Sequence, residues 1–336
     1  MRAHIRIRHS RMNDNHNKPS TNGWDTYWQG AKDNDAFVAG GFSHPAFPAL
    51  WARAADEFFA ANNKIEPLIL DIATGSGAVV EALTQAPAAR MENVSCVDIS
   101  AASIDGVTAR FPDVTGIVAD ATDVPLDSDR FNLITSQFGV EYAGGAAIDE
   151  AIRLLAPGGS LLFLMHIRPG VLYSECGAAI DALQRARDSR FVDLSRSFFE
   201  AGFAAVRGGD RAPYEAAAKA MNPAIKTLEA ILTEHGEHVA GDSIVALHST
   251  VQDIHSRIQH YNPDDVMHWL DGMEIELPKH EARMNSMHEA ALDADAFRSI
   301  CDRLTDAGLT IDRAQASKVE GVELPIAWML QATAPI

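Results

Sequence analysis

The sequence predicts an α/β protein with a doubly wound, mostly parallel seven-stranded sheet and a helical insertion between strands 5 and 6. Three observations lead to this prediction. An apolar run over 68–72 is followed by the turn Gly75-Ser76-Gly77 and a helix-forming segment, the order expected of a buried parallel strand, a tight loop and a helix. Strand-like and helix-like segments alternate across 66–170, which implies crossover connections. The alternation stops over 171–290 and then resumes.

These patterns divide the chain into five parts. We expect, in order, a disordered extension over 1–23, a helical cap over 24–62, an α/β core over 63–170, a helical insertion over 171–290, and a last helix with an antiparallel strand pair over 291–336.

Short runs rich in Val, Ile and Leu mark the strands. The parallel strands are expected over 67–72, 93–98, 114–119, 131–136 and 160–166, the last announced by the turn Ala156-Pro157-Gly158-Gly159. Apolar residues at helical spacing predict helices over 46–61, 78–83, 101–110, 146–155 and 296–307. The closing strands, 310–317 and 326–334, follow each other without a crossover helix, so they pair antiparallel or leave the sheet.

The insertion consists of long segments rich in Ala, Glu and Leu. Helical stretches are expected over 178–199, 214–235 and 243–260, with breaks near Gly208-Gly209, Gly236 and Asn262-Pro263. Two roles are open for it, a substrate lid that forms the acceptor pocket, or a contact within a homodimer.

Composition narrows the classes of partner. The chain has 336 residues, with 28 basic and 46 acidic side chains and a formal net charge of −18, which disfavours nucleic acid as a partner. Three scattered cysteines form neither a metal motif nor a disulfide framework and suit a cytoplasmic protein. The histidines of the insertion lack reliable ligand spacing, so no metal is expected. No apolar run approaches the length of a membrane span.

Carboxylates at the ends of successive strands indicate the ligand. Asp71, Asp98 and Asp120 end or follow the first three predicted strands, so they face one crevice at the carboxyl edge of the sheet. Asp98 lies about 20 residues beyond the glycine turn, where a carboxylate accepts ribose hydroxyls. A dinucleotide fingerprint needs a third glycine, and Val80 stands there. An acidic crevice repels a pyrophosphate but suits S-adenosylmethionine, which carries a sulfonium and an ammonium.

On these residues the chain resembles the class I S-adenosylmethionine-dependent methyltransferases of the small-molecule type (type 11/25-like). The resemblance covers about 65–170 and the final strand pair. It is carried by Leu70-Asp71-Ile72-Ala73-Thr74-Gly75-Ser76-Gly77, Val97-Asp98-Ile99-Ser100, Ala119-Asp120-Ala121, Phe131-Asn132-Leu133-Ile134-Thr135-Ser136-Gln137-Phe138-Gly139 and Leu155-Ala156-Pro157-Gly158-Gly159-Ser160-Leu161.

The resemblance implies a role for each motif. The first motif, with Asp71, Ala73, Gly75 and Gly77, is expected to hold the methionine end of the cofactor, although the family usually has glycine where Ala73 stands. The second, with Asp98 and Ile99, is expected to hold the ribose, and Asp120 with Ala121 the adenine. Gln137 and Phe138 are expected beside the methionine moiety and the substrate. A Gln-Phe-Gly sequence at the end of the fourth strand resembles methyltransferases of quinone biosynthesis.

Two residues at the same rim are candidates for catalysis. Glu141 follows the fourth strand and can act as a general base, or it can be a solvated loop carboxylate. His166 ends the fifth strand and can deprotonate a hydroxyl near neutral pH, or it can be a packed, hydrogen-bonded histidine. Trp28, with Trp24 and Tyr27, can cover the sulfonium with an aromatic face or pack on the core.

The expected function is therefore methyl transfer from S-adenosylmethionine to a small molecule, at oxygen, carbon or nitrogen. Two alternatives remain at this point. One is an NAD(P)-dependent oxidoreductase. The other is a non-catalytic S-adenosylmethionine-binding protein that acts through its helical insertion.

Overall fold

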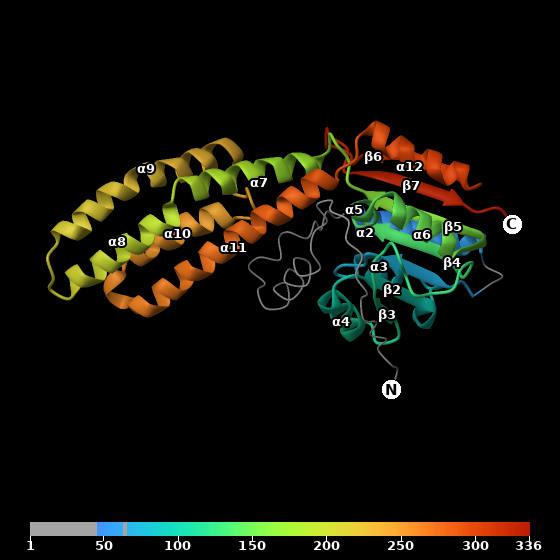
Figure 1. Ribbon diagram of the computed structural model, residues 1–336, viewed down its shortest axis with the longest axis horizontal. Coiled ribbons are helices and arrows are strands. Elements are labelled where there is room, and N and C mark those ends of the chain that lie inside the picture. Colours follow the sequence, from blue (N-terminus) through green and yellow to red (C-terminus); the bar gives the residue numbers. More distant parts are fainter. Residues whose placement is uncertain (1–45, 63–65) are drawn as a thin grey trace. The chain divides into compact units, whose positions relative to one another are not determined.

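The computed structural model describes residues 46–62 and 66–336 (Figure 1). The chain divides into two compact units, which we call the α/β unit (Met1–Val171 with Ala290–Ile336) and the helical unit (Leu172–Glu289). The predicted extension over 1–23 and the aromatic residues Trp24, Tyr27 and Trp28 lie outside the described residues.

The α/β unit is built on one seven-stranded sheet in the order β3-β2-β1-β4-β5-β7-β6. Its strands are β1 (Ile69–Ile72), β2 (Val94–Asp98), β3 (Thr115–Val118), β4 (Phe131–Gln137), β5 (Leu155–Met165), β6 (Thr310–Ser317) and β7 (Ala327–Thr333). Strands β1 to β5 pair in parallel, and β7 is antiparallel to both β5 and β6. This topology confirms the predicted doubly wound, mostly parallel sheet.

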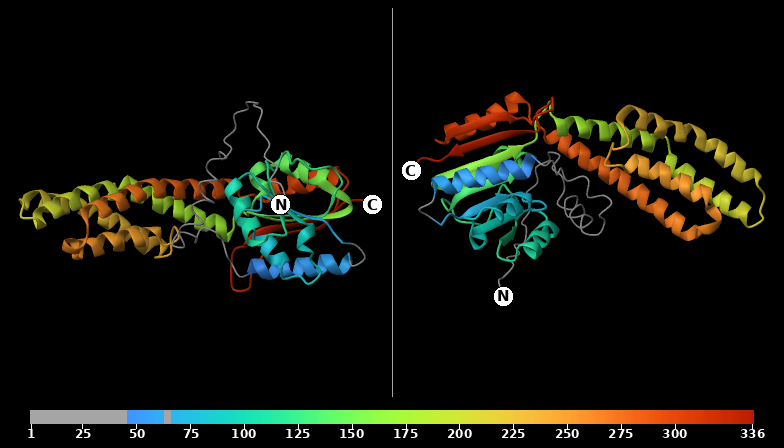
Figure 2. Two further views of the ribbon diagram at one scale, coloured as in Figure 1. Left: turned by 90° about the horizontal axis from the view of Figure 1, so that it is seen from below. Right: turned by 180° about the vertical axis from the view of Figure 1, so that it is seen from behind.

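Helices cover both faces of the sheet (Figure 2). Helices α2 (Ala46–Ala61), α3 (Ala78–Leu83) and α4 (Ala101–Arg110) share one apolar cluster with the sheet face that carries Ile69 and Leu133. The opposite face, with Leu70 and Ile134, packs against α6 (Gly145–Leu154) and α12 (Ala294–Asp306). The short α5 (Val140–Ala143) joins β4 to α6.

Strand β5 begins five residues earlier than predicted, at Leu155 instead of residue 160. The predicted turn over 156–159 is part of an irregular strand start, because the pairing with β4 jumps from Phe131↔Leu155 to Leu133↔Ser160. Gly158 has a φ of 70°, a backbone conformation that favours glycine. The turn signal was thus correct about the local kink and wrong about where pairing starts.

The helical unit contains five α-helices among its described residues. They are α7 (Val171–Asp188), α8 (Phe191–Val206), α9 (Ala212–His235), α10 (Ser243–Ser256) and α11 (Pro263–Ala290). One continuous helical stretch predicted over 178–199 is wrong, because the chain breaks at Arg190, which has a φ of 60°. The core of this unit draws buried residues from all five helices.

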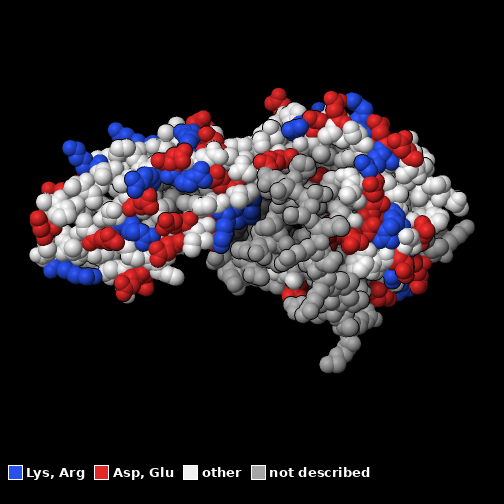
Figure 3. Space-filling model, viewed as in Figure 1, with Lys and Arg blue, Asp and Glu red and all other residues white. Residues whose placement is uncertain are grey.

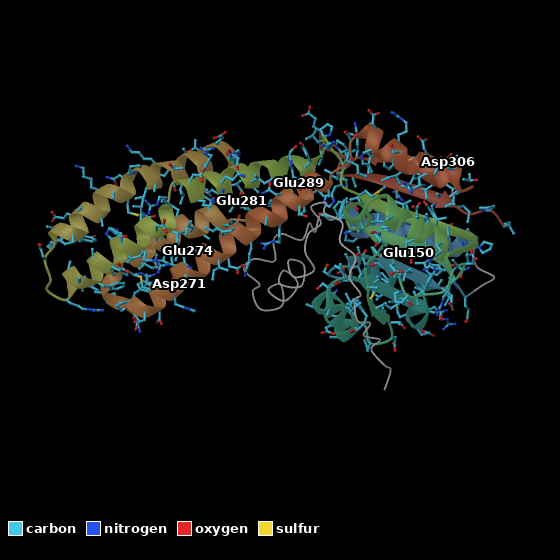
Figure 4. The ribbon with its side chains drawn as sticks, viewed as in Figure 1. Glu150, Asp271, Glu274, Glu281, Glu289 and Asp306 are labelled. Carbon is cyan, nitrogen blue, oxygen red and sulfur yellow. The ribbon has the colours of Figure 1, made fainter. Side chains whose placement is uncertain are left out.

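Ion pairs join α11 to α7 and α8. Glu281 pairs with Arg187, while Asp271 and Glu274 pair with Arg196 at 2.7 and 3.3 Å. These carboxylates are spaced along α11 (Figure 4). These ion pairs link α11, the longest helix of the unit, to α7 and α8.

Charged side chains of both signs are interspersed over the described surface on the face seen in Figure 3. Of the helices in the described ranges, none is both long and apolar enough to cross a membrane.

Candidate functional site

The candidate site lies where the strand order reverses. β1 pairs with β2 on one side and with β4 on the other, so the loops that follow these three strands lie around one edge of the sheet. In open α/β sheets a ligand binds at such a reversal, beyond the carboxyl ends of the strands. The register places Asp71 directly beside Cys96 of β2 and Thr135 of β4.

Asp71 lies beneath the loop that follows β1. Its side chain is buried, and it accepts hydrogen bonds from the Thr74 hydroxyl at 2.6 Å and the Thr135 hydroxyl at 2.8 Å. Burial raises the pKa of Asp71 to about 7, although both hydroxyls act in the opposite direction. Asp71 therefore ties the loop to β4.

Asp98 connects the loop after β1 to the start of α4. Its Oδ2 accepts the backbone N–H of Gly75 at 2.9 Å, and its Oδ1 accepts that of Ser100 at 2.9 Å. Ser103 donates its hydroxyl to the Gly75 carbonyl at 2.5 Å, a second link to the same loop. These hydrogen bonds fix the Asp98 carboxylate at the carboxyl edge of the sheet.

The loop itself uses left-handed backbone conformations. Ala73, Gly75 and Gly77 have φ values of 53°, 52° and 79°. A Cβ on Gly77 would come within 2.9 Å of Val107 in α4, so glycine is needed there for packing as well as for its φ angle. Of the three, Ala73 is the residue that carries a side chain in a conformation that disfavours one.

Asp120 and Ala121 follow β3, and both are half-buried, as is Ile99 after β2. The Oδ1 atom of Asp120 accepts both the backbone N–H of Thr122 at 2.9 Å and its hydroxyl at 2.7 Å. These bonds fix the orientation of the carboxylate, whose Oδ2 atom is also a hydrogen-bond acceptor.

The end of β4 is held by α2. Trp51 donates its indole N–H to Oε1 of Gln137 at 2.5 Å. Because the carbonyl end of the amide is bound in this way, Nε2 is the donor end left for other partners. Phe138, with a φ of 54°, places its ring 5.1 Å from that of Phe47 and 4.6 Å from that of His166.

The two catalytic candidates, 25 residues apart in the sequence, form a buried pair. Oε1 of Glu141 accepts the backbone N–H of His166 at 2.8 Å and contacts its Nδ1 at 2.7 Å. Their side chains are 0% and 3% exposed. Oε2 of Glu141 and Nε2 of His166 are buried atoms for which the described part of the chain supplies no hydrogen-bond partner. A solvated loop carboxylate is therefore not what the structure shows at Glu141.

The helical unit holds one group with metal-ligand geometry among the described residues, Asp181, Glu234 and His235. Arg185 donates to Asp181 at 2.9 Å and to Glu234 at 2.7 Å, and His235 contacts Asp181 at 2.8 Å. The Arg185 guanidinium thus already supplies the positive charge that a cation would bring.

Several contributors were missed in the sequence. Thr74 and Thr135 lie within two of the quoted motifs, and their hydroxyls could have suggested partners for Asp71. Trp51 lies on the apolar face of a predicted helix, and no spacing relates it to Gln137, which is 86 residues away.

A family model described as a methyltransferase domain matches residues 69–159. A demethylmenaquinone methyltransferase of Clavibacter sepedonicus is 36% identical over 110 residues, which cover 31% of this chain and 42% of the relative. A ubiquinone/menaquinone biosynthesis C-methyltransferase of Campylobacter jejuni is 31% identical over 102 residues, covering 29% and 43%. The chain thus spans less than half the length of these curated relatives.

Among solved structures, a putative S-adenosyl-L-methionine-dependent methyltransferase of Methanococcus maripaludis aligns over 97% of this chain and 98% of its own. It is 11% identical, with a TM-score of 0.41.

Proposed function

The α/β unit of this chain belongs to the class I S-adenosylmethionine-dependent methyltransferases, and on that premise we propose that the protein transfers a methyl group from S-adenosylmethionine to a small-molecule acceptor. The cofactor supplies an electrophilic methyl group on a sulfonium. The protein contributes a site that binds this cation and holds the acceptor in line with it, and such positioning can lower a barrier by about 7–11 kcal/mol.

The observation that carries the proposal is the fixed carboxylate of Asp98. Two backbone N–H groups hold it at the carboxyl end of β2, 7% exposed, at the place where a carboxylate binds ribose hydroxyls in such sheets. Asp120 is oriented after β3 by the backbone N–H and the hydroxyl of Thr122, which suits a contact with the exocyclic amine of adenine.

The loop after β1 and the end of β4 are proposed to bind the methionine end of the cofactor, which carries the sulfonium. The oriented Nε2 of Gln137 suits the methionine carboxylate, and Phe138 suits the region around the methyl group. We assign Asp71 a supporting role in place of direct contact, because it is only 1% exposed and hydrogen-bonds the Thr74 and Thr135 hydroxyls.

A small-molecule acceptor is supported by the relatives. One is named for demethylmenaquinone, and another is named a C-methyltransferase of ubiquinone and menaquinone biosynthesis. These names describe those proteins, and we transfer to this chain only the coarser class of acceptor.

The test is calorimetric titration of the purified protein with S-adenosylmethionine, with NADH as the competing cofactor. We expect binding of S-adenosylmethionine and a loss of about 10-fold or more in affinity in Asp98→Ala, since hydrogen bonds to a charged group are worth about 1.5–3 kcal/mol. The exposed Asp113→Ala is the matched control.

Asp98→Asn keeps one acceptor oxygen and separates the loss of charge from a folding defect, which circular dichroism monitors. Binding of NADH in place of S-adenosylmethionine would contradict the proposal and restore the oxidoreductase alternative. Cofactor binding without turnover of any acceptor would favour the non-catalytic alternative.

A further inference from the structure

The buried pair of Glu141 and His166 contains two hydrogen-bonding atoms that the described residues leave without a partner, Oε2 of the carboxylate and Nε2 of the imidazole. Buried polar groups in folded proteins are almost always hydrogen-bonded, because an unpaired one loses its hydration without compensation. Two such atoms on one contacting pair point to a ligand that completes them.

The hydrogen bonds determine which nitrogen of His166 carries the proton. An ionised carboxylate can only accept, so Oε1 of Glu141 takes a hydrogen from the backbone N–H of His166 and a second from Nδ1. In the neutral ring Nε2 then bears the lone pair. The unpartnered nitrogen is therefore a proton acceptor, and Oε2 of Glu141 is a second acceptor.

We propose that Nε2 of His166 is the general base of the methyl transfer, that Glu141 is its positioning residue, and that the acceptor reacts through a hydroxyl or an activated C–H carbon. This inference rests on the proposed function. A neutral amine already has a free lone pair and can attack without first losing a proton, so a buried base gives it no advantage. A hydroxyl or carbon acid must lose its proton as the new bond forms.

The step balances as follows. The proton of the acceptor moves to Nε2 of His166, and the electron pair it leaves forms the bond to the methyl carbon. The bond between this carbon and sulfur breaks, and its electron pair stays on sulfur as a neutral thioether. The imidazolium that results lies against the Glu141 carboxylate, whose charge it offsets. The proton leaves to solvent after product release.

The surroundings favour this proton transfer. The ring of Phe138 lies 4.6 Å from that of His166, and Tyr142 presents its ring edge-on at 5.7 Å. In such an apolar environment the attraction between the new imidazolium and the carboxylate is stronger than in water. The same rings suit an aromatic or conjugated acceptor.

The first measurement needs no acceptor. Nitrogen NMR of the histidine rings, at about pH 8 where a free imidazole is neutral, should show His166 protonated at Nδ1 and not at Nε2. Assignment comes from the missing signal in His166→Gln. A proton on Nε2 would overturn the proposal.

The second measurement uses naphthohydroquinone under nitrogen as a hydroxyl and carbon acceptor, and benzylamine as the amine. We expect methylation of the hydroquinone and a fall in kcat of about 100-fold or more in His166→Gln, with the affinity for S-adenosylmethionine unchanged. Added imidazole should restore part of the rate in His166→Gly. Glu141→Gln should lower kcat without changing the KM for the cofactor. His255→Gln in the helical unit is the control for loss of a histidine.

The outcomes separate the two claims. Failure to bind S-adenosylmethionine rejects the proposed function itself. Binding of the cofactor with faster methylation of benzylamine, with no methylation of the hydroquinone, or with an unchanged rate in His166→Gln, overturns the inference and leaves the cofactor assignment in place.

Discussion

Asp71 was predicted to contact the cofactor, but in the structure it hydrogen-bonds two threonines within the fold. Its position at the end of an apolar strand predicted a ligand contact, but the register of β1 against β4 places it beside Thr135 and beneath the loop. Burial raises its pKa from 3.8 to about 7. Burial thus favours the neutral form of this carboxyl and reduces the negative charge that it contributes to the site.

The raised pKa of Asp71 makes a prediction about stability. The folded state holds this proton more tightly than the unfolded state, so its contribution is full below about pH 4 and is lost as the pH rises through about 7. The total is on the order of 4 kcal/mol. We expect Asp71→Asn to remove this loss, so that the variant gains stability over the native protein as the pH rises. Urea unfolding across this range measures the difference.

The control for Asp71→Asn is Asp105→Asn, an exposed aspartate in α4. Its curve should follow that of the native protein at every pH. Parallel curves for Asp71→Asn and the native protein would show that Asp71 does not hold a proton in the folded state.

At the scale of elements, the strands and helices of the α/β core were largely predictable, because short apolar runs bounded by turn residues indicate parallel strands and apolar residues at helical spacing indicate helices. The helix breaks inside the helical unit were less predictable than the helices α2 and α3, whose predicted bounds match the observed ones. The break between α7 and α8 falls at Arg190, whose left-handed conformation has no sequence signal. The Glu141–His166 and Trp51–Gln137 contacts were equally hidden, because they form between segments that only the sheet topology brings together.

The loops after β1 and β4 pack closely against each other at Ala73 and Gly139. A Cβ on Gly139 would lie 2.5 Å from Cβ of Ala73 and 3.0 Å from its carbonyl oxygen. Gly139→Ala should therefore push the two loops apart, with a loss of about 1–3 kcal/mol in stability and about 10-fold or more in cofactor affinity.

Ala73→Gly is the matched variant for this contact. It removes the Cβ that clashes and relieves a φ of 53°, a conformation that costs a non-glycine residue about 1–2 kcal/mol. The double variant Ala73→Gly/Gly139→Ala should therefore recover part of the stability and part of the cofactor affinity that Gly139→Ala loses. A double-mutant cycle of unfolding and calorimetry measures this coupling, and strict additivity would show that the two positions do not contact each other.

At the scale of the whole molecule, the two units have separate apolar cores. All the buried residues of the helical unit's cluster fall within Leu172–Glu289. We therefore predict two unfolding transitions. Leu228→Ala, at a fully buried position of α9, should lower only the transition of the helical unit, by about 2–5 kcal/mol. S-adenosylmethionine should raise only the transition of the α/β unit, since a ligand stabilises the fold that binds it.

Lowering the pH from about 7 to about 5 should destabilise the helical unit and stabilise the α/β unit. His280 of α11 is buried against Ser243, and burial lowers its pKa from 6.5 to about 4, so the folded helical unit resists protonation. Its contribution is full above about pH 6.5 and is lost as the pH falls toward 4, a loss of about 2 kcal/mol by about pH 5. Asp71 has the reverse dependence, so the α/β unit gains stability over the same range.

Calorimetric scans at about pH 7 and about pH 5 measure this divergence, with bound S-adenosylmethionine identifying the transition of the α/β unit. His280→Gln should abolish the acid sensitivity of the other transition and leave the first unchanged. If a single transition instead moves with the cofactor, with Leu228→Ala and with pH together, the two cores unfold as one. The opposite pH dependences of Asp71 and His280 would then largely cancel in the free energy of unfolding. The single variants would reveal each one, because Asp71→Asn and His280→Gln should change the slope of this free energy against pH in opposite directions.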